Sequence, residues 1–236
     1  RRHTRYISVT GVQTCALPIY TPELRRQIES LHAAHPERRE IFGVLAAHIA
    51  RSPWGLAQAY TRFADQGAFL APPSILERYF FYNDDDGIES YQSFLAEYSS
   101  DPAWSVETHD AYIRILSKGQ TRAIEILANR PERDGQPEIS RLLDQRHRSP
   151  DIFVHRGHDV HVEESLRYLN PDAKLIYLGS CGGLEVTATA LSKAREAQIL
   201  ATSGIGMTNI NDPILKALNS ELLRTTGPVD WSKFWK

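Results

Sequence analysis

The stretch from Asp151 to Gly183 reads DIFVHRGHDVHVEESLRYLNPDAKLIYLGSCGG. Two short apolar runs, Ile152–His155 and Lys174–Leu178, flank a segment of about two helical turns at Val162–Leu169, which Asn170-Pro171 ends. Apolar runs without strict alternation are typical of strands that are buried on both faces of a parallel sheet. The stretch therefore predicts a strand–helix–strand unit whose strands lie side by side, joined by a right-handed crossover.

The alternation of strands and helices continues on both sides of this unit. We expect further strands at 78–82, 104–109, 112–117, 123–128 and 198–202, and further helices at 90–98, 139–146, 184–196 and 213–224. This order predicts the α/β class and a three-layer α/β/α sandwich with a mostly parallel sheet.

The chain before this domain has a different character. Val9–Ile19 reads VTGVQTCALPI, which matches the in-frame translation of a sequencing-library adapter, and Arg1–Arg5 fits the upstream part of the same adapter. We therefore interpret residues 1–19 as foreign and expect the native start to be missing. Residues 20–73 have helical periodicity, and a proline pair at their end predicts a boundary before the α/β domain of residues 74–236.

Composition narrows the class of protein. Without residues 1–19, 24 basic residues stand against 29 acidic ones, and this net charge of −5 argues against a nucleic-acid partner. No apolar run is long enough to span a membrane, and the expected loss of the native start leaves a signal peptide open. We expect a cytoplasmic location. Cys181 is the only cysteine besides Cys15, which makes it a candidate nucleophile. The oligomeric state is not indicated.

His158 and Cys181 each follow one of the two apolar runs. Because the carboxyl ends of parallel strands meet at one edge of a sheet, we expect the two side chains to lie near each other. An imidazole can take the proton of a thiol, and only the thiolate attacks well. Gly182-Gly183 begins a helix whose N–H groups could stabilise a thiolate or an oxyanion. The sequence thus predicts a His–Cys half-site.

Gly157-His158 and Gly179-Ser-Cys-Gly182 resemble the two motifs of the caspase-like superfamily of cysteine peptidases. In metacaspases, caspases and gingipain-like peptidases one strand ends in Gly-His-Gly or Ser-His-Gly, and the next ends in Ser-Cys or Ala-Cys. The resemblance implies that His158 is the general base, that Cys181 is the nucleophile, and that the backbone N–H groups of Asp159 and Cys181 form the oxyanion hole. It also implies a peptide or protein substrate and no cofactor.

The same resemblance implies a substrate pocket near Asp84, Asp85 and Asp86, which follow the first strand of the domain. Such an acidic pocket would favour Arg or Lys before the scissile bond. The triplet could equally bind a cation or cap the following helix. Further candidates for substrate contacts are Ser180, Gly182 and Ser203.

Two other hypotheses stay open. Asp159 stands where the family usually has Gly, and the 23-residue interval from His158 to Cys181 is shorter than in most members, which suits a non-catalytic interaction module on the same fold. Alternatively, His155, His158 and His161 recur every third residue and, with Cys181, could hold zinc in a metal-dependent hydrolase. His155 could instead be a core histidine, or the base itself if its strand ends earlier.

Overall fold

The computed structural model describes residues 7–9, 74–118, 122–195, 197–202, 204–224 and 234. The chain divides into two compact units, and the first, Arg1–Gly11 with Ala71–Thr226, holds all of these except Phe234. The helical segment expected at 20–73 lies outside the described residues.

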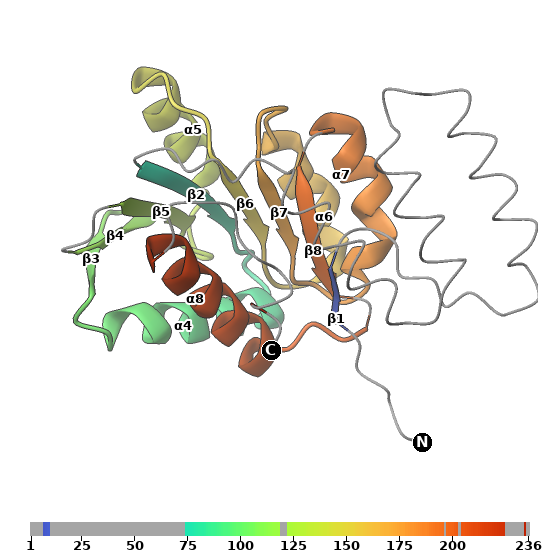
Figure 1. The fold of residues 1–236 in the computed structure, drawn as a ribbon, viewed down its shortest axis with the longest axis horizontal. Helices are drawn as coiled ribbons and strands as arrows, with labels where there is room; N and C mark the ends of the chain where they lie inside the picture. The colour runs from blue at the N-terminus through green and yellow to red at the C-terminus, as the bar shows by residue number, and fades with distance from the viewer. Residues whose placement is uncertain are drawn as a thin grey trace, which may run out of the picture. The chain divides into compact units, whose positions relative to one another are not determined.

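An eight-stranded sheet forms the centre of the first unit, in the order β1-β8-β7-β6-β2-β5-β4-β3 (Figure 1). The strands are β1 Ile7–Val9, β2 Ser74–Phe80, β3 Trp104–Thr108, β4 Tyr112–Ser117, β5 Ala123–Asn129, β6 Ile152–His155, β7 Leu175–Leu178 and β8 Gln198–Thr202. The five strands from β8 to β5 run parallel, whereas β4, β3 and β1 are antiparallel to their neighbours. The predicted mostly parallel sheet is confirmed, and β1 belongs to the segment interpreted as foreign.

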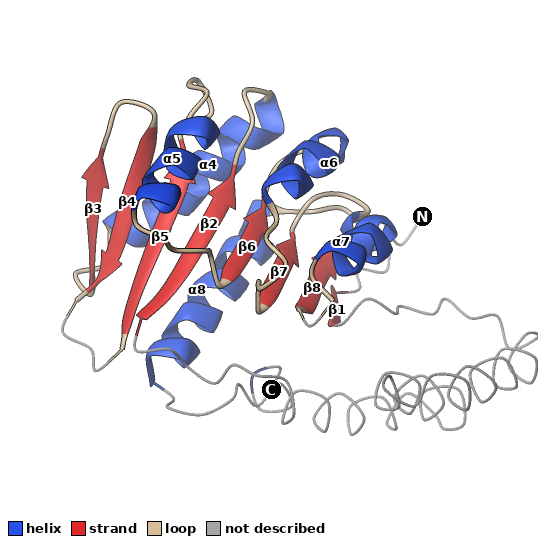
Figure 2. Cartoon of the chain, turned by 90° about the horizontal axis from the view of Figure 1, so that it is seen from above, coloured by secondary structure: helices blue, strands red, loops and turns tan. Residues whose placement is uncertain are grey.

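Helices cover both faces of the sheet (Figures 1 and 2). They are α4 Asp85–Ser99, α5 Gln136–Gln145, α6 Val162–Ser165, α7 Thr187–Lys193 and α8 Thr208–Arg224, with short 3-10 helices η3 Asp159–His161, η4 Leu166–Tyr168 and η5 Gly183–Val186. Apolar residues of α5, α6 and α7 pack on one face, and α4 packs against α8 on the other. This is the predicted three-layer α/β/α sandwich.

The middle strand β2 explains why the apolar runs do not alternate. Successive side chains of a strand point to opposite faces of the sheet. Tyr79 therefore packs against Phe94 of α4, with ring centroids 4.8 Å apart and planes tilted by 30°, while Phe80 contacts Phe153 on the other face at 4.7 Å. Both β2 rings have no exposed surface, because helices cover the strand on both faces of the sheet.

The predicted bounds of the first strand of the domain and of two helices were wrong. The strand β2 spans Ser74–Phe80 and not 78–82. α4 begins at Asp85 rather than at residue 90, because the Asp84 carboxylate accepts a hydrogen bond of 2.6 Å from the Gly87 N–H and caps the helix. α8 begins at Thr208, and Pro213, which was expected at its start, lies inside it. By contrast, β4, β6 and β8 have the predicted bounds. No helix in the described part of the chain is long and apolar enough to cross a membrane.

Candidate functional site

The register of β6 and β7 relates the two motif residues directly. These neighbouring strands run parallel, and His155 at the end of β6 pairs with Leu178 at the end of β7. His158 and Cys181 each lie three residues beyond this pair. Their loops therefore leave the same edge of the sheet at the same level, on adjacent strands about 4.8 Å apart.

Glycine shapes both loops. Gly157 has a φ of +106°, and a Cβ atom there would lie 3.1 Å from the Cα of Gly87 at the start of α4. Gly182 has a φ of +61°, and its N–H donates to the Gly204 carbonyl at 3.0 Å. Such conformations suit glycine far better than other residues. The glycines next to His158 and Cys181 thus permit the turns that bring both residues to the sheet edge.

Cys181 is a free, half-buried cysteine between β7 and η5. Its backbone N–H, like that of Asp159, has no acceptor among the described residues. The two groups proposed for an oxyanion hole are therefore not used in the local hydrogen-bond pattern. A developing negative charge beside the thiol could accept from them without first breaking a bond.

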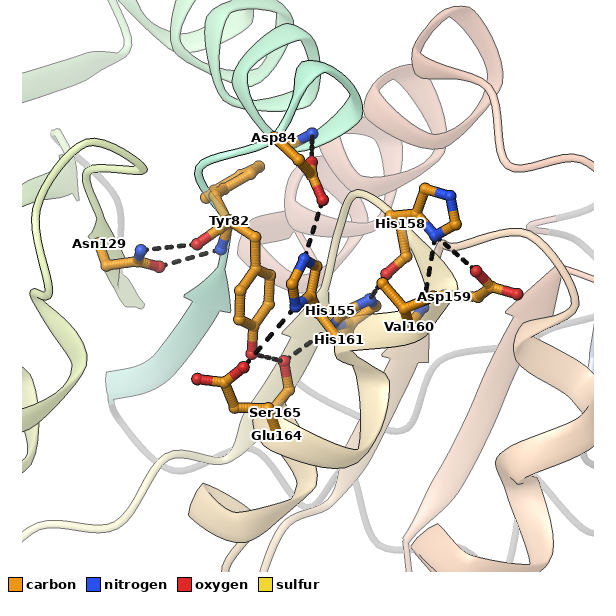
Figure 3. A network of polar contacts seen from close by, with 12 residues as sticks. Tyr82, Asp84, Asn129, His155, His158, Asp159, Val160, His161, Glu164 and Ser165 are labelled. Atoms are coloured by element: carbon orange, nitrogen blue, oxygen red, sulfur yellow. Dashed lines mark hydrogen bonds and ion pairs between the residues drawn. The ribbon is translucent and has the colours of Figure 1, made fainter.

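The His158 imidazole is 48% exposed and lies with Nδ1 2.6 Å from Asp159 Oδ1 and 3.4 Å from the Val160 nitrogen (Figure 3). The two contacts exclude each other, because the carboxylate needs a proton on Nδ1 and the amide needs a lone pair there. The ring accepts from the Val160 N–H when Nδ1 is unprotonated, and it pairs with the Asp159 carboxylate when Nδ1 carries a proton. The proposed chemistry uses the second state, with the proton on Nδ1 beside Asp159. This state leaves the lone pair of a neutral imidazole on Nε2, as a general base requires. In the described part of the chain, no hydrogen bond joins His158 to Cys181.

Buried beneath His158, the side chain of His155 is part of a directed hydrogen-bond chain (Figure 3). Its Nε2 lies 3.2 Å from the carbonyl oxygen of His158, which can only accept, so Nε2 carries the proton. Nδ1 then accepts from the Ser165 hydroxyl at 2.8 Å, and Ser165 accepts from Tyr82 at 2.7 Å. Burial lowers the pKa of His155 to about 4. His155 is thus a neutral core histidine that holds the backbone of His158.

His161 ties the loop after β6 to the start of α4. Its Nε2 lies 2.9 Å from Asp84 Oδ2, and its ring stacks on Tyr82 with the planes 4° apart and the centroids at 4.1 Å (Figure 3). Asp84 also caps α4, so one carboxylate fixes two elements. Asp84, the first residue of the acidic triplet, therefore has a structural role that involves no contact with a substrate.

The three histidines of the metal-site alternative have different partners. His155 points into the core, His158 binds Asp159, and His161 binds Asp84. No group of three His, Cys, Asp or Glu side chains among the described residues could hold a metal ion. The three-residue spacing fails because β6 ends at His155 and the chain then turns, so the three side chains do not share a face.

A cleft of about 140 Å³ lies beside the two loops. It is lined by Asp86, Glu89, Ser90, Gly157, Gly179, Gly206, Met207, Thr208 and Asn211. Gly157 precedes His158 directly, and Gly179 lies two residues before Cys181, so the cleft opens next to both motif residues. Two carboxylates from the first turns of α4 give it a negative character.

The other predicted substrate contacts have different positions. Asp86 lines the cleft, whereas its exposed neighbour Asp85 does not. Ser180 is fully buried, and its hydroxyl has no hydrogen-bond partner in the described part of the chain. Gly182 forms the turn after Cys181. Ser203 lies outside the described residues.

Glu89 is a cleft residue that the sequence reasoning missed. It lies three positions after Asp86 on α4, and such a spacing places two side chains on one face of a helix. The signal was present in the sequence, but it was lost because the expected helix began only at residue 90.

Comparison with family models, with curated proteins and with solved structures found no match to this chain. The case for a function therefore depends on the geometry of this site and on the motif resemblance.

Proposed function

We propose that the protein is a cysteine peptidase of the caspase-like superfamily, with Cys181 as the nucleophile and His158 as the general base. The observation that carries the proposal is the shared offset of the two residues from the paired ends of β6 and β7. Two loops that leave adjacent strands at the same level can bring an imidazole to a thiol by side-chain rotation alone. The exposed His158 ring has room for this rotation.

The proposed reaction uses only groups of the chain and water. His158 Nε2 takes the proton of the Cys181 thiol, and the thiolate attacks the carbonyl carbon of the scissile peptide bond. The resulting oxyanion accepts hydrogen bonds from the N–H groups of Asp159 and Cys181. The imidazolium then protonates the leaving amine as the carbon–nitrogen bond breaks. Water attacks the thioester, returns a proton to His158 and releases the acid product together with the thiolate.

The acidic cleft favours substrates with a basic residue before the scissile bond. Asp86 and Glu89 are exposed carboxylates that line one cleft. Their negative charge attracts the positive charge of an arginine or lysine side chain. We infer that this cleft receives the side chain on the acyl side of the cleaved bond. The alternative role for the acidic triplet, capping of α4, belongs to Asp84.

Hydrolysis of fluorogenic peptides with Arg or Lys before the reporter group tests the proposal. The full chain with Cys15 replaced by Ser should release the reporter, and Cys181→Ala should abolish the release. His158→Ala should lower kcat by about a hundredfold or more, the usual contribution of a general base. Undiminished hydrolysis by Cys181→Ala would rule out the thiol as the nucleophile.

One observation favours a second candidate, a non-catalytic interaction module on the same fold. His158 binds Asp159, the residue that stands where the family usually has glycine, and not Cys181. If this contact locks the imidazole away from the thiol, Asp159→Gly should create thiol reactivity that the parent protein lacks. A parent protein that already reacts through His158 would exclude this candidate.

A further inference from the structure

Two consecutive residues of α8, Asn211 and Asp212, hold the two loops of the candidate site. The Asn211 amide donates to the Gly179 carbonyl at 2.9 Å and accepts from the Tyr177 hydroxyl at 2.7 Å. Asp212 Oδ1 lies 2.8 Å from Nη2 of Arg156. Gly179 begins the loop that carries Cys181, and Arg156 begins the loop that carries His158. One end of one helix therefore contacts both.

The packing around these contacts is tight. A Cβ atom on Gly179 would lie 3.0 Å from Cδ of Arg156 and 3.3 Å from Cγ of Asn211. A Cβ atom on Gly206, just before α8, would lie 2.4 Å from the Gly179 carbonyl oxygen and 3.2 Å from the Cys181 nitrogen. The backbones pack this closely because both positions are glycine. A shift of the start of α8 would therefore be transmitted directly to the Cys181 loop.

The buried ion pair between Arg156 and Asp212 is expected to add little to the free energy of unfolding. The two side chains are 1% and 2% exposed, and burial of both charges removes their hydration. Although Nη2 and Oδ1 are close, the guanidinium has no hydrogen-bond partner among the described residues. Burial has the largest effect on the pKa of Asp212 and raises it, although a hydrogen bond from Ser93 lowers it. Apolar residues of similar size would stabilise this position as well or better. The pair thus indicates a requirement for a fixed geometry between α8 and the His158 loop.

We propose that Asn211 and Asp212 are positioning residues that set the spacing between the His158 loop and the Cys181 loop. The inference builds on the proposed His–Cys function and adds the helix that aligns its two members. It also identifies the start of α8 as the place where a displacement would separate the imidazole from the thiol. Neither residue touches the reacting atoms. Asn211 also lines the acidic cleft, so alkylation of the thiol, which needs no peptide in that cleft, is the readout that isolates its effect on the loop.

The test measures the coupling between the imidazole and the thiol, not overall activity. In the full chain with Cys15→Ser, the rate of iodoacetamide alkylation of Cys181 at pH 6.5 is divided by the rate in the same protein with His158→Ala. We expect a ratio of about ten or more for the parent, as a thiol pKa lowered by one unit gives tenfold more thiolate.

Two variants remove the proposed contacts, and a third variant is the matched control. Asn211→Leu releases the Cys181 loop, and the double variant Arg156→Met/Asp212→Leu releases the His158 loop without leaving a buried unpaired charge. The control, Asn219→Leu, is the same substitution at another buried position of α8, where the amide binds Glu77 and Tyr98 instead. Thermal melting checks that each protein is folded.

We expect the ratio to fall to about one to three in both contact variants and to stay near the parent value in Asn219→Leu. The inference is overturned if the folded contact variants keep the parent ratio, or if Asn219→Leu lowers it equally, since loss of stability alone would then explain the effect. A parent ratio of one would instead refute the proposed dyad itself. The two failures are therefore distinguishable.

Discussion

His155 Nε2 lies 3.2 Å from the backbone carbonyl oxygen of His158, so a buried histidine fixes the main chain of an exposed one. The two residues lie three positions apart, and the same ring type has opposite roles in the two places. Burial lowers the pKa of His155 to about 4 and keeps its ring neutral at physiological pH, whereas the His158 ring is 48% exposed.

The buried ring predicts a pH dependence of stability. The pKa of His155 is about 4 in the folded protein and 6.5 without burial, so the unfolded chain binds more protons between these values. Its contribution to the free energy of unfolding is complete above pH 6.5 and is lost as the pH falls towards 4. From pH 7.5 to pH 5 the loss should be about 2 kcal/mol. Urea unfolding of His155→Gln should lack this increment, and an unchanged dependence would contradict it.

Glu77 predicts the opposite slope. It is fully buried in β2, accepts from the Asn219 amide at 3.3 Å, and burial raises its pKa from 4.5 to about 8. The folded state therefore binds the extra proton, and stability declines as the pH rises from 4.5 through 8. Between pH 5 and pH 7.5 the loss should be about 3 kcal/mol. Glu77→Gln should remove it and be more stable than the parent at pH 7.5, as measured by urea unfolding.

These slopes oppose each other in the same pH window, so the parent protein should show a shallow dependence. The single variants reveal the two components separately: Glu77→Gln should gain stability from pH 5 to pH 7.5, and His155→Gln should lose it. If both variants kept the slope of the parent, neither group would titrate as its burial requires.

The strands β6 and β7 were predictable because each is a short, fully buried run of mainly apolar residues. By contrast, β2 carries the buried Glu77 and Arg78 and begins four residues before the predicted strand. The runs at β6 and β8 have the predicted bounds, as does the antiparallel β4. Prediction failed where a polar side chain changes the backbone. Capping of the following helix was one of the roles open for the acidic triplet, and the Asp84 carboxylate has this role. The expected helix nevertheless began only at residue 90, which left the cleft residue Glu89 outside it.

The two candidate residues were easier to identify from the sequence than the side chains that hold their loops. His158 and Cys181 stand in recognisable motifs, and strand order alone places them at one edge. The pairing of Arg156 with Asp212 joins residues 56 positions apart, on elements whose contact no local pattern reveals. Similarly, only the observed end of β6 distinguishes a core His155 from a metal ligand or a base.

The acidic cleft predicts which residues set substrate preference. Neutralising both cleft carboxylates in Asp86→Asn/Glu89→Gln should lower kcat/KM for peptides with Arg before the scissile bond by about tenfold to a hundredfold, as charged hydrogen bonds are lost. Peptides with Leu at that position should be unaffected. Asp85→Asn is the matched control, because this neighbouring carboxylate is exposed and does not line the cleft. An equal effect of the control would show that only net charge matters.

The turn before His158 requires a glycine at position 157, because this residue adopts a positive φ. Replacement by alanine would force a side chain into a φ of +106° and place Cβ 3.1 Å from the Cα of Gly87. Gly157→Ala should therefore lower the free energy of unfolding by about 1–3 kcal/mol in urea unfolding. Gly204→Ala is the control, since a Cβ atom there meets nothing within 4 Å. Equal midpoints for the two variants would contradict the assigned turn.

The central claim, that His158 and Cys181 form one reactive pair, is tested most directly by the pH profile of iodoacetamide alkylation at Cys181 in the full chain with Cys15→Ser. The account predicts a midpoint well below the ordinary thiol pKa of about 8.5, and a return towards that value in His158→Ala. A midpoint near 8.5 in both proteins would contradict the pair and make the thiol a structural one.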